Sequence, residues 1–126
     1  MIIKRTDPGP HHCMSVVHGN IVYLAGFVAD EKPVTLRHEG EESASPIYEQ
    51  TKAILAKIDR YLALAGTDKS KILASQVWIR DLAEYDEYNR AWDEWVDPDN
   101  QPVRATVESR LAKDIYKIEI MVTAAI

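Results

Sequence analysis

Two charged residues near the end of the chain, Arg104 and Glu119, have the types and spacing that suit chemistry on a small carboxylate. Each interrupts a run in which apolar residues recur at every second position, 103–108 and 118–122. A period of two predicts a strand with one buried face. If both strands turn their apolar rows to one core, Arg104 and Glu119 share the other face of the sheet. A guanidinium and a carboxylate on rigid strands can bind and process a small carboxylate.

The same pair has a simpler interpretation, which is a surface salt bridge or two unrelated charges on strands. The sequence supports the two interpretations about equally. Burial would favour a site, because removing one partner of a buried ion pair costs roughly 3–5 kcal/mol. An arginine that faces a cleft therefore needs either a protein partner or the carboxylate of a ligand.

The elements that must position this pair follow from hydrophobic periodicity and turn residues. In chain order they are a short strand (2–5), a hairpin (14–17 and 21–24), a polar loop (30–45) with a brief extended piece at 34–36, a helix (46–65), a strand (72–79), a helix (82–95) and the two strands of Arg104 and Glu119. Ser45 and Pro46 are typical of a helix start, and Gly66 of its end. Asp81 and Glu84 predict a capping box.

This order predicts one α+β domain over residues 1–126, with both helices on one face of a mixed sheet. The strand 72–79 should turn Leu73, Ser75, Val77 and Ile79 to one side. The second helix should bury a stripe formed by Tyr85, Tyr88, Trp92 and Trp95. The uncovered sheet face is too apolar for plain exposure to solvent, which predicts packing against other subunits. Its expected residues are Ala74, Gln76, Trp78, Thr106, Met121 and Thr123.

The composition is that of an ordinary soluble domain, with 46% hydrophobic and 28% charged residues among 126. A net charge of −5 disfavours nucleic acid and anionic membrane surfaces as partners. No run approaches the ~20 apolar residues that span a bilayer, so a cytoplasmic location is expected. The lone Cys13 agrees with a reducing compartment. His11, His12 and Cys13 are adjacent and no other cluster completes a ligand set, so we expect no metal site.

Asn89 is a polar amide on the aromatic-rich second helix, where it either caps a backbone group or lines a pocket. Together with the elements above, it completes a resemblance to the RidA/YjgF family of reactive-intermediate (enamine/imine) deaminases. Segments 19–26, 50–66 and 77–89 look like the family's early strand, first helix and strand-to-helix passage. The C-terminal signature is the most specific, and comprises Pro102-Val103-Arg104-Ala105-Thr106-Val107-Glu108, Leu111, Lys113-Asp114 and Ile118-Glu119-Ile120.

The resemblance implies a chorismate-mutase-like α+β fold and a homotrimer whose sheets form a central barrel, with three clefts at the subunit interfaces. It implies no cofactor and no metal. It would make Arg104 the carboxylate clamp, the backbone of Thr106 a polar contact and Glu119 the group that positions or activates water. Asn89 matches a further site position. The implied reaction is hydrolysis of a 2-imino acid, such as 2-iminobutanoate or 2-iminopropanoate, to a 2-keto acid and ammonia.

The chain departs from the family pattern at two pocket positions and in one connection. His12 stands where active members commonly have Tyr, and Ala25 where they have Ser. The connection before Arg104 is also shorter. His12 either replaces the lost hydroxyl as a donor or faces solvent. A hydrolytic deaminase is the leading hypothesis, and the alternative is a non-catalytic trimer that binds small carboxylate or carbonyl metabolites. Ribonuclease activity, sometimes attributed to this family, fits poorly with the acidic charge.

Overall fold

Six strands form one mixed sheet in the computed structural model, which describes residues 1–29 and 45–126. Their order across the sheet is β1-β2-β3-β6-β4-β5, and β4 and β5 are the one parallel pair among these neighbours. The strands are β1 (Ile3–Thr6), β2 (Ser15–His18), β3 (Ile21–Leu24), β4 (Ile72–Ile79), β5 (Val103–Glu108) and β6 (Ile118–Ala125). The predicted α+β fold with a mixed sheet is confirmed.

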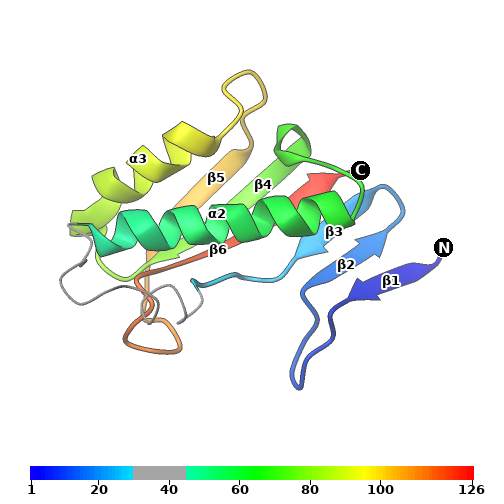
Figure 1. The fold of residues 1–126 in the computed structure, drawn as a ribbon, viewed down its shortest axis with the longest axis horizontal. Helices are drawn as coiled ribbons and strands as arrows, with labels where there is room; N and C mark the ends of the chain where they lie inside the picture. The colour runs from blue at the N-terminus through cyan, green and yellow to red at the C-terminus, as the bar shows by residue number, and fades with distance from the viewer. Residues whose placement is uncertain (30–44) are drawn as a thin grey trace, which may run out of the picture.

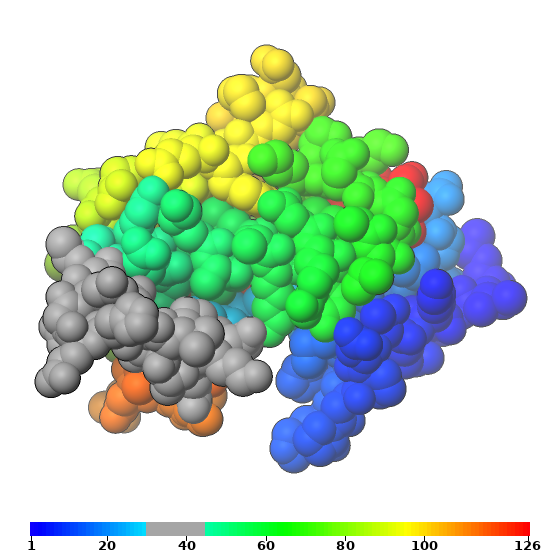
Figure 2. Space-filling model, in the orientation of Figure 1, coloured from blue at the N-terminus to red at the C-terminus, as the bar shows by residue number. Residues whose placement is uncertain are grey.

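Both helices lie on the same face of the sheet, as predicted (Figure 1). They are α2 (Pro46–Leu64) and α3 (Tyr85–Trp95), and single turns of 3-10 helix, η1 (Lys69–Lys71) and η2 (Leu82–Glu84), precede β4 and α3. Seen from this side, α2 and α3 cover the middle of the molecule (Figure 2). None of the helices in the described ranges is long and apolar enough to cross a membrane.

The predicted ends of α2 are largely confirmed. The helix begins at Pro46, although the side chain of Ser45 makes no capping hydrogen bond to the first turn. It stops before Gly66, which has a φ of 84° and whose N–H donates to the carbonyl of Ala63. A left-handed conformation is costly for any residue with a Cβ, so glycine suits this position. The predicted loop over 30–45, including the extended piece at 34–36, lies outside the described residues except for Ser45.

The predicted capping box before the second helix is wrong. The carboxylate of Asp81 accepts from the N–H of Ala83, 2.9 Å away, and so caps η2 rather than α3. The carboxylate of Glu84 pairs with Nζ of Lys117 at 3.4 Å instead of returning to the backbone of Asp81. As a result, α3 begins at Tyr85, three residues later than predicted.

The strand β4 has the predicted bounds, but one residue at its start faces the other way. A register shift in its pairing with β6 falls between Ile72 and Ala74. Ile72 is therefore buried and Leu73 is 48% exposed, which corrects the predicted placement of Leu73 in the core row. Ser75, Val77 and Ile79 face the core as predicted. A bulge adds a residue without a partner, so the alternation slips by one position there.

The strand β5 turns its faces the opposite way from the prediction. Arg104 and Thr106 are the register partners of the buried Ser75 and Val77, and so they face the helices. The apolar row of Val103, Ala105 and Val107 lies on the uncovered face, where Val103 is 73% exposed. Alternation defines two rows in a strand but does not decide which row meets the core.

The strand β6 follows the prediction, and this separates the two charges. Ile118, Ile120 and Val122 are fully or almost fully buried beneath the helices, so Glu119 and Met121 occupy the uncovered face. Arg104 and Glu119 therefore lie on opposite faces of the sheet within one protomer, not together as predicted. The uncovered face does not contain Thr106 and instead contains the apolar row of β5, so it is more apolar than the sequence indicated.

Candidate active site

The guanidinium of Arg104 lies against the aromatic side of α3. Its central carbon is 4.9 Å from the centre of the Tyr88 ring and 5.1 Å from that of Trp92. Its Nη2 donates to Oδ1 of Asn89 at 2.9 Å and to the hydroxyl of Tyr85 at 3.3 Å. Among the described residues, no group accepts a hydrogen bond from Nε or Nη1 of Arg104. A guanidinium held in this way keeps donors that a ligand can use.

The sequence of α3 builds this environment through helical spacing. Four residues of α3 recur at spacings of three or four and therefore share the side of the helix that faces β5. They are Tyr85, Tyr88, Asn89 and Trp92. The rings of Tyr85 and Tyr88 meet edge to face at a centroid distance of 5.9 Å, and those of Tyr88 and Trp92 at 6.4 Å. The predicted aromatic stripe therefore has a second role, because two of its members, Tyr88 and Trp92, also stack on Arg104.

The hydroxyl of Tyr88 ties α3 to the neighbour of Arg104 on the same strand. It lies 3.3 Å from Oγ1 of Thr106. Burial, more than any other effect, raises the pKa of Tyr88 to about 12, while its hydrogen bond with Thr106 and the nearby charge of Arg104 act in the opposite direction. Tyr88 is therefore a neutral phenol at ordinary pH and serves as a hydrogen-bonding wall rather than as a base.

A pocket opens beside the guanidinium, with a volume of about 470 Å³ and a lining of Leu82, Tyr85, Arg104 and Thr106. At its rim the carboxylate of Glu108 accepts from the N–H of Leu82 at 3.0 Å. We call this the Arg104 pocket. It brings three predicted site residues together, because Asn89 and Thr106 both flank Arg104. The arrangement suits a ligand with a carboxylate at one end and an apolar group at the other.

The carboxylate of Glu119 lies on the uncovered face against Gly26, the second residue after β3. A Cβ added to Gly26 would lie 3.2 Å from Cδ of Glu119 and nearer still to Oε2. Phe27 and Ile120 exchange backbone hydrogen bonds of 2.8 and 3.0 Å, which fix this loop onto β6. Within the described part of the chain, no group donates a hydrogen bond to the Glu119 carboxylate. We call Gly26 and Glu119 the Glu119 ledge.

The remaining predicted site residues lie far from the Arg104 pocket. His12 is exposed in the loop between β1 and β2, and β2 is four strands away from β5 in the sheet order (Figure 1). At about 4.8 Å per strand this separation is roughly 19 Å. Ala25 follows β3, where its N–H donates to the carbonyl of Met14 at 2.9 Å and its side chain packs against the core. One protomer therefore holds the predicted site in separate parts.

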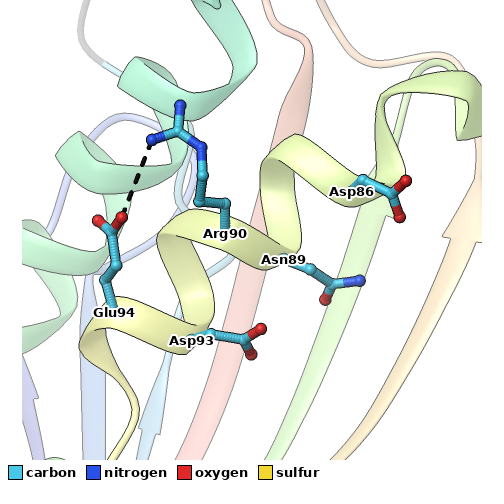
Figure 3. A pocket seen from close by; sticks show the side chains of 5 residues that line it. All are labelled: Asp86, Asn89, Arg90, Asp93 and Glu94. Atoms are coloured by element: carbon cyan, nitrogen blue, oxygen red, sulfur yellow. Dashed lines mark ion pairs between the residues drawn. The ribbon is translucent and has the colours of Figure 1, made fainter.

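A second depression, of about 790 Å³, lies along the exposed side of α3 and is lined by Asp86, Asn89, Arg90, Asp93 and Glu94. Figure 3 shows Arg90 and Glu94 on one side of the helix, with Asp86, Asn89 and Asp93 pointing the other way. The Arg90 guanidinium bonds the Glu87 carboxylate at 2.8 Å and pairs with Glu94 at 3.8 Å. Three carboxylates and an arginine that is already paired make this depression unsuitable for an anionic ligand.

Sequence reasoning missed two residues at these sites. Tyr85 was predicted as core but is 38% exposed and bonds Arg104. Gly26 is an isolated glycine in the sequence, and nothing there places it under Glu119. As for metals, no three His, Cys, Asp or Glu side chains in residues 1–29 and 45–126 lie close enough to hold an ion.

Comparison with known proteins shows which family the chain belongs to. The model of the family described as Endoribonuclease L-PSP matches residues 4–126. A RutC family protein from Haemophilus ducreyi is 41% identical, over 99% of this chain and 97% of its own length. The chain belongs to the RidA/YjgF family. The resemblance inferred from the sequence is thereby confirmed.

One RidA/YjgF crystal structure supports the fold, and one relative in sequence has a name that states an activity. The crystal structure of a YjgF family member from Neisseria meningitidis superposes with a TM-score of 0.85 at 34% identity, covering 99% of this chain and 95% of that one. A protein from Acinetobacter baylyi named 3-aminoacrylate deaminase RutC is 30% identical over 80% of this chain and 75% of its own length. The RidA/YjgF chain described here thus shares its fold with the first and, more distantly, its sequence with the second.

Proposed function

We propose that this RidA/YjgF protein hydrolyses 2-imino acids to 2-keto acids and ammonia. The observation that carries the proposal is the state of Arg104. Its guanidinium is held by two aromatic faces and by Asn89, yet Nε and Nη1 are without acceptors among the described residues. A rigid guanidinium with open donors is suited to hold the carboxylate of a 2-imino acid in one orientation.

The active site would form between two copies of the chain. Arg104 and Glu119 face opposite sides of the sheet, so a ligand bound by Arg104 cannot meet Glu119 of the same copy. The uncovered face carries Val103, Val107 and Met121, which are 73%, 46% and 38% exposed. Such a face favours burial against further copies. A closed homotrimer would bring the Glu119 ledge of one copy to the Arg104 pocket of the next.

Each site residue then has a defined part in the reaction. Arg104 binds the carboxylate, and the protonated imine carbon is the electrophile. The Glu119 carboxylate takes a proton from water as the water oxygen bonds to that carbon, which gives a carbinolamine. The proton passes from Glu119 to the amine; the Glu119 carboxylate then takes the proton of the new hydroxyl as the C=O bond forms and the C–N bond breaks, so that ammonia and the keto acid are released. Thr106, Asn89, His12 and Ala25 would line the substrate. A relative named as a deaminase of 3-aminoacrylate, a small enamine carboxylate, supports this reaction class.

The activity is tested by ammonia release from imines made in situ by an amino-acid oxidase. We expect wild-type protein to accelerate the release, and Arg104→Ala and Glu119→Gln each to lose at least about 100-fold in kcat/KM. Tyr48→Phe, which alters a hydroxyl bonded to Glu94 on the outer helix surface, serves as the matched control and keeps its rate. Wild-type protein without any acceleration would refute the proposal.

The sharing of sites is tested by mixing the two inactive variants. If Arg104→Ala and Glu119→Gln chains are refolded together, every mixed trimer contains one site with both residues intact. With random assembly at equal amounts, about three quarters of trimers are mixed, so about a quarter of wild-type activity should return. If activity stays at the level of the separate variants, Arg104 and Glu119 do not serve one site from two copies.

A second candidate is a trimer that binds small carboxylate or carbonyl metabolites without turning them over. It is favoured by one observation, which is that the Arg104 pocket is formed within a single protomer and that none of its four lining residues in the described part of the chain carries a carboxylate or an imidazole. Calorimetry with 2-keto acids separates the candidates. Binding that Arg104→Ala abolishes, in a protein that releases no ammonia from any imine, would favour the binding protein.

A further inference from the structure

The wall of the Arg104 pocket indicates which side chains a substrate can carry. We propose that the site prefers 2-imino acids with branched or longer apolar side chains, and that Leu82 and Tyr85 determine this preference. The inference rests on the proposed function, because it assumes that Arg104 binds the substrate carboxylate. It adds the substrate class, which neither the fold nor the family fixes.

The Arg104 pocket offers apolar surface that a three-carbon substrate leaves uncovered. Leu82 and Tyr85 line it next to the guanidinium. A three-carbon imino acid carries a single methyl group beyond its carboxylate and imine. A substrate with a larger apolar side chain covers more of this lining and removes more apolar surface from solvent.

The side chains that line the pocket are apolar where the side chain of a substrate would contact them. Leu82 is 48% exposed and Tyr85 is 38% exposed, so both present apolar surface beside the guanidinium. Tyr85 cannot turn freely, because its hydroxyl accepts from Nη2 of Arg104 at 3.3 Å and its ring packs on the edge of Tyr88. The tyrosine therefore has two separable parts, a hydroxyl that positions Arg104 and a ring that contacts the substrate side chain.

Charge at the rim works against acidic side chains. The carboxylate of Glu108 is held at the pocket edge by the N–H of Leu82, 3.0 Å away. A second carboxylate on the substrate would lie near Glu108 and far from the guanidinium that binds the first. Two carboxylates held close to each other repel. Dicarboxylic substrates are therefore disfavoured, and neutral apolar side chains remain.

The test compares imines made from D-alanine and D-leucine by D-amino-acid oxidase, with semicarbazide competing for the imine. The leucine side chain has three carbons more than that of alanine. At about fourfold per fully buried carbon, partial burial of these three predicts a kcat/KM about tenfold higher for the leucine-derived imine. We expect Leu82→Ala and Tyr85→Ala to lower this ratio to about twofold. Tyr85→Phe should keep the ratio and lower both rates roughly three- to tenfold through the lost hydrogen bond to Arg104. Leu64→Ala, an exposed leucine on α2, is the matched control for Leu82→Ala.

Calorimetry keeps failure of the preference distinct from failure of the deaminase. We expect 4-methyl-2-oxopentanoate to bind more tightly than pyruvate, and both more tightly than 2-oxoglutarate. Imine hydrolysis with equal rates for both substrates, or a ratio unchanged in Leu82→Ala and Tyr85→Ala, would overturn the preference and leave the deaminase standing. If the keto acids bind in the expected order but the protein hydrolyses no imine, the deaminase is refuted and the preference of the pocket for apolar side chains stands.

Discussion

Replacing Gly26 by alanine should move the Glu119 carboxylate without removing it. The new Cβ would lie 3.2 Å from Cδ of Glu119 and closer to Oε2 than two such atoms can approach. The carboxylate is the free end of a side chain, so it can yield by about 1 Å while the backbone stays in place. A displacement of about 1 Å in a catalytic group can cost about 100-fold in rate. We therefore expect kcat/KM to fall roughly 10- to 100-fold.

The same substitution should cost little stability. Gly26 does not have a positive φ, so alanine can adopt its backbone conformation. Gly66→Ala is the matched control with the opposite outcome. Gly66 has a φ of 84°, and a Cβ added there would meet no atom within 4 Å. The change therefore strains the backbone by about 1–2 kcal/mol without a steric clash. That cost lowers Tm by roughly 4–8 °C and leaves kcat/KM unchanged.

The assay pairs imine hydrolysis with thermal unfolding for wild type, Gly26→Ala and Gly66→Ala. Gly26→Ala with wild-type kcat/KM would show that the position of the Glu119 carboxylate does not matter, which refutes its role in activating water. A loss of Tm in Gly26→Ala as large as that in Gly66→Ala would show that the backbone had moved, and the activity loss could then not be assigned to Glu119.

Three further outcomes are expected. The pKa of Tyr88 rises from 10.0 to about 12 on folding, so the unfolded chain releases this proton first and stability falls as the pH rises through this window. Between about pH 9 and 11, wild type should lose about 1 kcal/mol more unfolding free energy than Tyr88→Phe, as measured by urea titration. Met121→Asp, on the uncovered face, should dissociate the assembly in sedimentation and abolish hydrolysis, and an active monomer would contradict the shared site. With a net charge of −5 the protein should not retain RNA on a filter at low salt, and salt-sensitive retention would contradict this.

The sequence predicts the elements of this fold well because their signals are local. Pro46 and Gly66 bound α2 through their own backbone preferences, and the alternation in 72–79 gives β4 its limits. The capping box failed for a physical reason. Asp81 and Glu84 have the right spacing, but Lys117, distant in sequence, offers the Glu84 carboxylate a charged partner that the backbone of Asp81 cannot match.

The candidate site was predicted in part, and the errors lie at the edge of the sheet. Arg104, Asn89 and Thr106 do come together, because α3 is the connection between the parallel strands β4 and β5 and returns its inner side to β5. The predicted shared face of Arg104 and Glu119 is wrong, because the apolar row of β5 lies on the uncovered face and not against the core. In an edge strand, alternation alone does not show which row faces the core, because the other row can be buried against another subunit.

That ambiguity is itself informative about β5. Its polar row is the one that faces the helices, where Asn89 accepts a hydrogen bond from Nη2 of Arg104 and the Tyr88 hydroxyl bonds Thr106. Its apolar row faces outward, where nothing in the described chain covers Val103. A strand gains nothing from exposing its apolar row to water, so this orientation makes physical sense only if that row is buried elsewhere. On the proposed trimer, assembly would bury Val103 and Val107 and would also bring a Glu119 ledge to the Arg104 pocket, so that a chain unable to assemble would be both less stable and inactive.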